Sequence, residues 1–525
     1  MLSSFPQLRQ KRFYYILISL VLLLFSILIL YNANWVFDIF HVDDEQFVSA
    51  TAIGKPVYAW SGSGRFWPLG LFDYNWLLLL FPKGASPFSH FVYNCLTMFV
   101  TCFVLFSYLN RVLKNRVEIS LICMGVLFIS SCFLRLYMMC TYPDRQLILM
   151  LSLFLYFYWR GANERSKKCL FISLLAAIYA SYLKEPVFVA LTVFALSNLL
   201  FEKSQHTKSF NYALLINSAI FVVLYLVYSG CVFGETMYHQ ASFVPKRLAL
   251  RSFDHDPFMF ILMILGFVRV YLVVFKKKRF DTTDAALFAG IAYTLVYVLI
   301  DVHEYYLVVP SLILELSALG RFFAENKGKL KTTVVILLCL CLPVSLFNSI
   351  KTTRDIHWHR ENDSDIFYEI IEAQKSGSKV LYIDKLGDGD FTFKRYKTFF
   401  DYYSKSDFPL IHEHNSDAID ENSIVIVCFP EFSDRSVLFN QLQRIKKCGL
   451  KLCHSNKEIR TEIYRNPESY SNHTQKKSRD LAIRALIGNK NFRRVIKWTG
   501  QYPTPTSALF FSKAIESNNV VVGFF

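Results

Sequence analysis

Long apolar segments recur along the first two thirds of this sequence and set the strongest limit on its fold. Most hold roughly 16 to 20 residues, the length that lets an α-helix cross a bilayer, and none follows residue 347. We expect about eleven membrane-spanning helices, the first retained as an anchor because it lacks an Ala-x-Ala cleavage site. The predicted spans are 13–31, 91–109, 117–134, 146–159, 169–183, 187–201, 211–229, 257–275, 285–300, 305–320 and 331–347.

The composition also favours a membrane protein. Of the 525 residues, 53% are hydrophobic and only 19% are charged, which is too apolar for an ordinary soluble protein of this length. The net charge of +16 fits anionic lipid head groups better than nucleic acid, because Lys and Arg collect in the cytoplasmic loops of membrane proteins. We therefore expect the lipid bilayer as a partner and no nucleic acid.

The distribution of basic residues predicts the orientation. Alternate connections between the predicted spans, counted from the N-terminus, carry 20 Lys and Arg in one set and 9 in the other. The richer set is expected in the cytoplasm. The N-terminus is then cytoplasmic, and after eleven spans the chain continues on the extracytoplasmic side, where the connection from about residue 32 to 90 also lies.

The last third of the chain has a different pattern. Short β-type runs, Lys379–Ile383 and Ser423–Val427, alternate with helical stretches such as Ser436–Lys447 and Thr474–Leu486. We expect residues 1–349 to form an α-helical transmembrane domain and 350–525 a soluble extracytoplasmic α/β domain. The polar stretch Lys351–Asp365 is the expected join, and the role of the second domain stays open.

The connection after the first span carries candidate chemistry. Asp43, Asp44 and Glu45 are three consecutive carboxylates at the membrane surface, which can act as a general base, join a cation site or simply be solvated. The same connection delivers Arg65 within a glycine-bearing stretch beside aromatic residues. Its guanidinium suits a phosphate group, although an interfacial Arg packed beside belt aromatics fits the local pattern equally well.

Two further outer connections carry charges close to the bilayer. Lys184 and Glu185 stand in a short turn between two spans, where they can bind a substrate or form a pair that closes the hairpin. His303, Glu304 and Tyr305 precede the tenth span and can contact a lipid phosphate or a sugar, with aromatic-belt anchoring as the alternative for the tyrosine. All these groups share one face of the membrane.

Asp144 and Arg145 form another outer pair, which we interpret as structural. No certain cofactor is indicated, no metal site is predicted, and the sequence leaves open whether Mg²⁺ or Mn²⁺ takes part. No Walker loop or GxSxG motif occurs.

The Asp43-Asp44 pair, the Lys184-Glu185-Pro186 turn and the stretch from His303 to Tyr306 together resemble the GT-C class of membrane glycosyltransferases. Within that class, the chain is most similar to the bacterial and phage-encoded glucosyltransferases that modify O-antigen, and the resemblance covers roughly residues 10–350. It implies a multi-pass protein of the bacterial inner membrane. It also implies transfer of a sugar, glucose being expected, from undecaprenyl phosphate to a surface polysaccharide on the periplasmic side.

The resemblance also implies roles for individual residues. We expect Asp44, with Asp43 second, as the general base, and Arg65 and Lys184 as contacts to the donor phosphate. Glu185 would position Lys184 or the acceptor. Two alternatives are a polysaccharide polymerase, with its key residues in large mid-chain loops, and a lipid-linked sugar flippase, with paired halves and charges inside the spans.

Overall fold

The computed structural model of the chain describes residues 5–32, 51–57, 66, 68–70, 72–139, 143–202, 205–232, 256–300, 304–326, 328–383, 393, 397, 400–412, 416–428, 439–448, 450–456 and 461–465. The chain divides into two compact units, the first comprising Met1–Ala33 with Gly54–Thr353 and the second Asn34–Ile53 with Arg354–Phe525. The first unit is helical, and the second is built around a β-sheet. Each is described by itself below.

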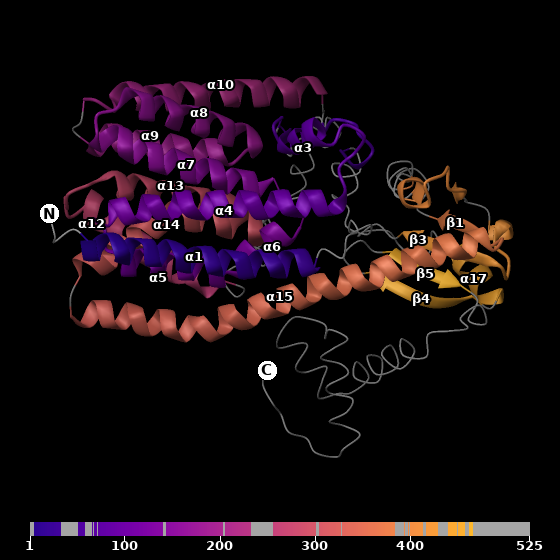
Figure 1. Cartoon of the computed structure of the whole chain (residues 1–525). Coiled ribbons are helices and arrows are strands. Elements are labelled where there is room, and N and C mark those ends of the chain that lie inside the picture. Colours follow the sequence, from indigo (N-terminus) through magenta and orange to yellow (C-terminus); the bar gives the residue numbers. More distant parts are fainter. Residues whose placement is uncertain are drawn as a thin grey trace, which may run out of the picture. The chain divides into compact units, whose positions relative to one another are not determined.

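Each of the eleven segments predicted to span the membrane is helical, and Figure 1 shows these helices running side by side in the first unit. The helices are α1 (Phe5–Asn32), α4 (Pro87–Val112), α5 (Val117–Ile129) with α6 (Ser131–Met138), α7 (Asp144–Asn163), α8 (Lys167–Leu183), α9 (Val187–Phe201), α10 (Lys208–Val232), α12 (Pro257–Val274), α13 (Thr282–Ile300), α14 (Glu304–Glu325) and α15 (Lys329–Lys375). By length and hydropathy, five helices in the described part of the chain can cross a membrane, and the bent α5–α6 pair makes a sixth.

The predicted span 117–134 is two helices rather than one. α5 and α6 meet at Ser130 and differ in direction by 63°. The Ser130 side chain accepts a hydrogen bond from the backbone N–H of Phe133 at 3.4 Å, so it caps α6 as a new helix instead of continuing α5. Apolar periodicity alone did not reveal this break, because the apolar run resumes after Ser130 and Ser131 with Cys132, Phe133 and Leu134.

The predicted join at Lys351–Asp365 is also helical. α15 continues past the unit boundary to Lys375, since its sequence offers neither Gly nor Pro between Pro343 and Gly377. Gly377 then adopts a positive φ of +100°, the left-handed conformation that commonly ends a helix.

Close packing of α7 against α8 depends on a glycine. A Cβ atom at Gly161 would lie 2.6 Å from Leu170 Cγ and 3.0 Å from the Leu170 backbone nitrogen. We expect Gly161→Ala to lower stability by about 1–3 kcal/mol, because the two helices must separate to admit the methyl group. Thermal unfolding in detergent would measure the loss.

Gly125 in α5 supplies the matched control for that substitution. No atom lies within 4 Å of a Cβ built there. Gly125→Ala should therefore leave the melting temperature unchanged or raise it, since alanine favours the helix by roughly 1 kcal/mol. Equal melting temperatures for the two variants would mean that the α7–α8 contact does not limit stability.

The second unit holds a five-stranded mixed sheet in the order β2-β1-β3-β5-β4. β1 pairs in parallel with β2 and β3, whereas β5 pairs antiparallel with β3 and β4. Strands at Lys379–Ile383 and from Ser423 match the sequence prediction, while Thr474–Leu486 lies outside the described residues. The strands are β1 (Lys379–Ile383), β2 (Leu410–His412), β3 (Ser423–Cys428), β4 (Lys451–Asn456) and β5 (Thr461–Arg465).

One face of this sheet carries a hydrophobic core. Leu381 and Ile383 of β1 and Val425 of β3 pack with Ile445 of α17 (Phe439–Lys447). These three strand residues point to the same side because side chains alternate between the two faces of a strand. α17 therefore covers this face.

Candidate functional site

Two buried ion pairs lie at one end of the helical bundle. Lys184, directly after α8, donates from Nζ to both carboxylate oxygens of Asp144, at 2.7 and 2.6 Å. Arg145 donates from Nη2 to Oδ2 of Asp73 at 2.6 Å. None of the four side chains is more than 2% exposed. Charges buried at a bilayer edge are costly, so such a cluster marks a candidate site.

The start of α7 accounts for both pairs. Asp144 and Arg145 are its first two residues, and successive helical residues point about 100° apart around the axis. Asp144 therefore reaches the α8–α9 turn, whereas Arg145 reaches the short 3-10 helix η2 (Phe72–Tyr74) in the connection between α1 and α4. Through these two residues α7 ties the two connections together.

Aromatic rings surround the Arg145 guanidinium. Its Cζ lies 4.0 Å from the centroid of the Tyr74 ring and 5.9 Å from that of Tyr93. The Tyr74 hydroxyl donates to Oδ1 of Asn94 at 3.2 Å, and the His90 ring packs against Tyr74 at 4.8 Å. This arrangement fixes the plane of the guanidinium and keeps water from the Asp73 pair.

Two tyrosines of α13 and one further carboxylate complete the cluster. The hydroxyls of Tyr293 and Tyr297 lie 3.5 Å apart. Glu185 is half-buried, so it is more accessible than the four paired residues. It is therefore the described acid of the cluster best placed to meet a substrate.

Of the residues predicted from the sequence, Lys184 and Glu185 belong to this cluster. Glu304 and Tyr305 lie in the first turn of α14, and their side chains are outside the described set. The predicted residues outside the described part of the chain are Asp43, Asp44, Arg65 and His303.

The structure adds residues that the sequence prediction did not select. Asp73 was not singled out, although it is the one charged residue between Arg65 and Lys83, which is a usable signal. Asp144 and Arg145 were interpreted as a structural charged pair, and each forms its short ion pair with a residue of a different connection between helices. Within the described residues, no three His, Cys, Asp or Glu side chains gather as they would around a metal ion.

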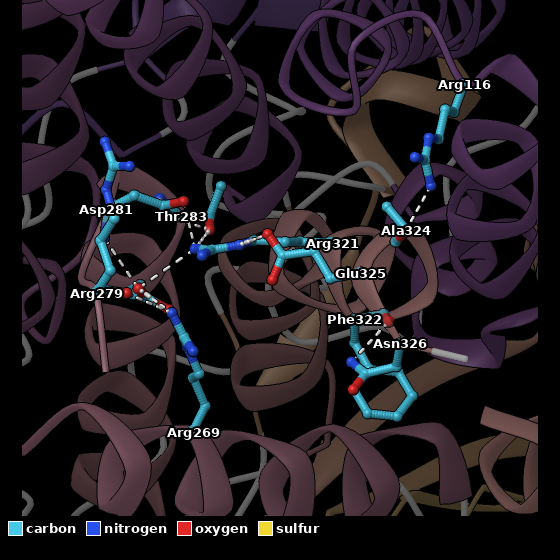
Figure 2. A network of polar contacts seen from close by, with 11 residues as sticks. Arg116, Arg269, Arg279, Asp281, Thr283, Arg321, Phe322, Ala324, Glu325 and Asn326 are labelled. Atoms are coloured by element: carbon cyan, nitrogen blue, oxygen red, sulfur yellow. Dashed lines mark hydrogen bonds and ion pairs between the residues drawn. The ribbon is translucent and has the colours of Figure 1, made fainter. Parts of the chain in front are cut away.

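A second polar network lies at the other end of α13. Arg269 of α12 donates to both carboxylate oxygens of Asp284 at 2.7 and 2.8 Å. Figure 2 shows Arg321 of α14 beside it, in contact with Asp281, with Thr283 at 3.2 Å and with Glu325 at 2.7 Å. These contacts join the ends of α12, α13 and α14, so we interpret this network as structural.

Comparisons with known proteins place this architecture. Neither a family model nor a curated protein matches the sequence. The crystal structure of ArnT from Cupriavidus metallidurans bound to undecaprenyl phosphate is similar, with a TM-score of 0.50 at 12% identity, over 87% of this chain and 99% of that one. This chain has a GT-C-like fold.

The GT-C-like fold confirms the fold class that the three short motifs of the sequence resemble. At 12% identity the likeness concerns the fold alone. The structure of the same ArnT in the apo state has a TM-score of 0.49 at 10% identity, over 89% of this chain and 100% of that one. The buried ion pairs around Asp144 belong to a membrane protein fold of this class.

Proposed function

We propose that this protein is a membrane glycosyltransferase. It transfers a sugar, expected to be glucose, from an undecaprenyl-phosphate carrier to a surface polysaccharide such as O-antigen, on the periplasmic side of the bacterial inner membrane. The observation that carries the proposal is the GT-C-like fold with buried charges gathered at one end of its apolar bundle. The ArnT structure contains undecaprenyl phosphate, which supports a carrier of that class.

In the proposed reaction, a carboxylate of the first outer connection acts as the general base. Asp44, or Asp43 beside it, removes the proton from an acceptor hydroxyl. The hydroxyl oxygen then attacks the anomeric carbon, and the bond from that carbon to the phosphate oxygen breaks. The sugar passes to the acceptor, and undecaprenyl phosphate is released with its negative charge.

Cationic groups would stabilise the departing phosphate. We assign this task to Arg65 and Lys184, because charge that develops in a water-poor site is stabilised most by donors already held in place. Glu185, half-buried beside Lys184 in the same turn, would orient Lys184 or the acceptor. His303, Glu304 and Tyr305 would contact the sugar or the phosphate.

The buried Asp73–Arg145 pair also supports the proposed reaction. It holds η2, the end of the same connection that carries Asp43, Asp44 and Arg65, against α7. Anchoring η2 in this way would lower the cost of bringing a base and a phosphate contact to one substrate. No metal ion is part of this proposal.

Deletion of the protein tests the proposal in the host. We expect the surface polysaccharide to lose one sugar residue per modified repeat, visible as a loss of mass and of one linkage in methylation analysis. Return of the sugar on expression of the intact protein, but not of Asp44→Asn, would tie the change to transfer. An unchanged polysaccharide would contradict the proposal and favour a transporter of lipid-linked sugar.

A further inference from the structure

The parallel half of the second unit brings the carboxyl ends of three strands to one edge of the sheet. β1 lies between β2 and β3, and all three strands are parallel. The chain passes from β1 to β2 on one side and then returns across β1 to reach β3 on the other. The connections therefore diverge between β1 and β3, and in open α/β sheets ligands bind beyond the carboxyl ends of the strands. The β1–β2 side of the sheet shares that carboxyl end.

Three aromatic side chains gather at that end of β1 and β2. Tyr382 of β1 stands directly opposite His412 of β2 in the sheet register, and their rings lie 5.7 Å apart. Phe393, from the segment that joins β1 to β2, stacks on His412 with ring centroids 4.7 Å apart and an interplanar angle of 11°. Phe393 also contacts Tyr382 at 5.8 Å.

This aromatic cluster, Tyr382 with Phe393 and His412, is not part of the core that α17 covers. Leu381 and Ile383 point to the α17 side, so Tyr382 between them points to the opposite face. Tyr382 is fully buried and forms the base of the cluster, whereas Phe393 and His412 are only half-buried. Each of these two residues therefore keeps part of its surface accessible.

We propose that this aromatic cluster binds a sugar ring of the polysaccharide acceptor. A pyranose ring has one face of C–H groups and a rim of hydroxyls. An aromatic ring packs against the C–H face, while a polar atom at its edge can hydrogen-bond a hydroxyl. That the bound sugar belongs to the acceptor rests on the proposed transfer reaction. The binding itself can be measured without it.

The test uses the full-length protein in detergent and polysaccharide released from the host's lipopolysaccharide by mild acid. We expect saturation-transfer NMR to detect binding by the wild type. Phe393→Ala and His412→Ala should each weaken binding by about tenfold, the upper range for one aromatic contact. The affinity of His412→Phe should lie between that of the two alanine variants and that of the wild type, because phenylalanine keeps the stacked ring but lacks the imidazole nitrogens.

Tyr368→Ala is the matched control, since Tyr368 forms an aromatic pair with Tyr403 in the same unit at 6.3 Å and is 45% exposed. It should bind as the wild type does. Melting temperatures identify any variant that loses its fold. If the alanine variants do not fold, the affinity of His412→Phe is compared with that of the wild type instead. Wild-type affinity in folded Phe393→Ala and His412→Ala, or no binding by the wild type, would overturn the inference.

Transfer assays separate this inference from the proposed function. If both hold, Phe393→Ala should raise KM for the acceptor about tenfold and leave kcat unchanged. Binding that depends on Phe393 in a protein that transfers no sugar would support the site and contradict the function. Normal transfer by Phe393→Ala with an unchanged KM for the acceptor would support the proposed function and contradict the sugar-binding site.

Discussion

Asp44→Asn is expected to lower the rate of sugar transfer by about two to four orders of magnitude, the usual contribution of a general base. Asparagine has the same shape as aspartate but does not accept a proton at neutral pH. The acceptor hydroxyl would then attack while it still carries its hydrogen. The measurement is transfer of labelled sugar from a synthetic polyprenyl-phosphate donor by the purified protein.

Control variants keep this result interpretable. Glu118→Gln removes an exposed carboxylate from the first turn of α5 and should leave transfer unchanged. The amount of Asp44→Asn in the membrane fraction should equal that of the wild type, because an acidic residue outside the spans contributes little to insertion. Asp43→Asn tests the neighbouring carboxylate. Full activity in both Asp43→Asn and Asp44→Asn would exclude this pair as the base.

Separating Lys184 from Asp144 should have the largest effect on stability. Asp144→Asn leaves the ammonium of Lys184 buried without its counter-charge, and Lys184→Met does the same to the carboxylate. Removing one partner of a buried ion pair costs about 3–5 kcal/mol. We expect either single variant to unfold at a markedly lower temperature in detergent.

The double variant Asp144→Asn/Lys184→Met decides what the pair is for. Its stability should return close to that of the wild type, because an apolar or neutral pair of similar size avoids burying a lone charge. If Lys184 also contacts the donor phosphate, the double variant should fold stably but still transfer sugar poorly and bind the donor weakly. Wild-type transfer by the double variant would limit Lys184 to closing the α8–α9 turn.

An exposed ion pair serves as the control for the loss of stability expected on breaking the buried pair. Arg160 and Glu164 pair across one turn at the end of α7 at 2.9 Å, with 33% and 38% of their side chains exposed. Exposed pairs of this kind contribute little to stability, because water screens the two charges. Arg160→Gln should therefore change the melting temperature very little.

The helical part of the fold could be predicted from the sequence because the apolar runs are long. Each predicted span coincides with a helix, and the differences are local. Ser130 divides one span through a side-chain hydrogen bond of its own, and α15 runs on through a polar stretch that contains no helix breaker. Strands β1 and β3 were equally evident from their short β-branched runs.

The site could be predicted only as a set of charges on one side of the membrane. The sequence determined that Lys184, Glu185, Asp144 and Arg145 stand at helix ends, since they lie just outside the long apolar segments. It did not determine which charges meet. Asp144 and Arg145 are adjacent in the chain, yet their ion pairs are with residues 40 and 72 positions away.

The tertiary structure alone decided those pairings, because an ion pair depends on which helix ends pack together and on the direction in which each side chain leaves its helix. The same holds for the second unit, where Tyr382, Phe393 and His412 meet only once β1 and β2 align in register. Hydropathy indicates whether each segment lies in lipid or in water. Contacts between distant segments arise from packing, which no local pattern of residues encodes.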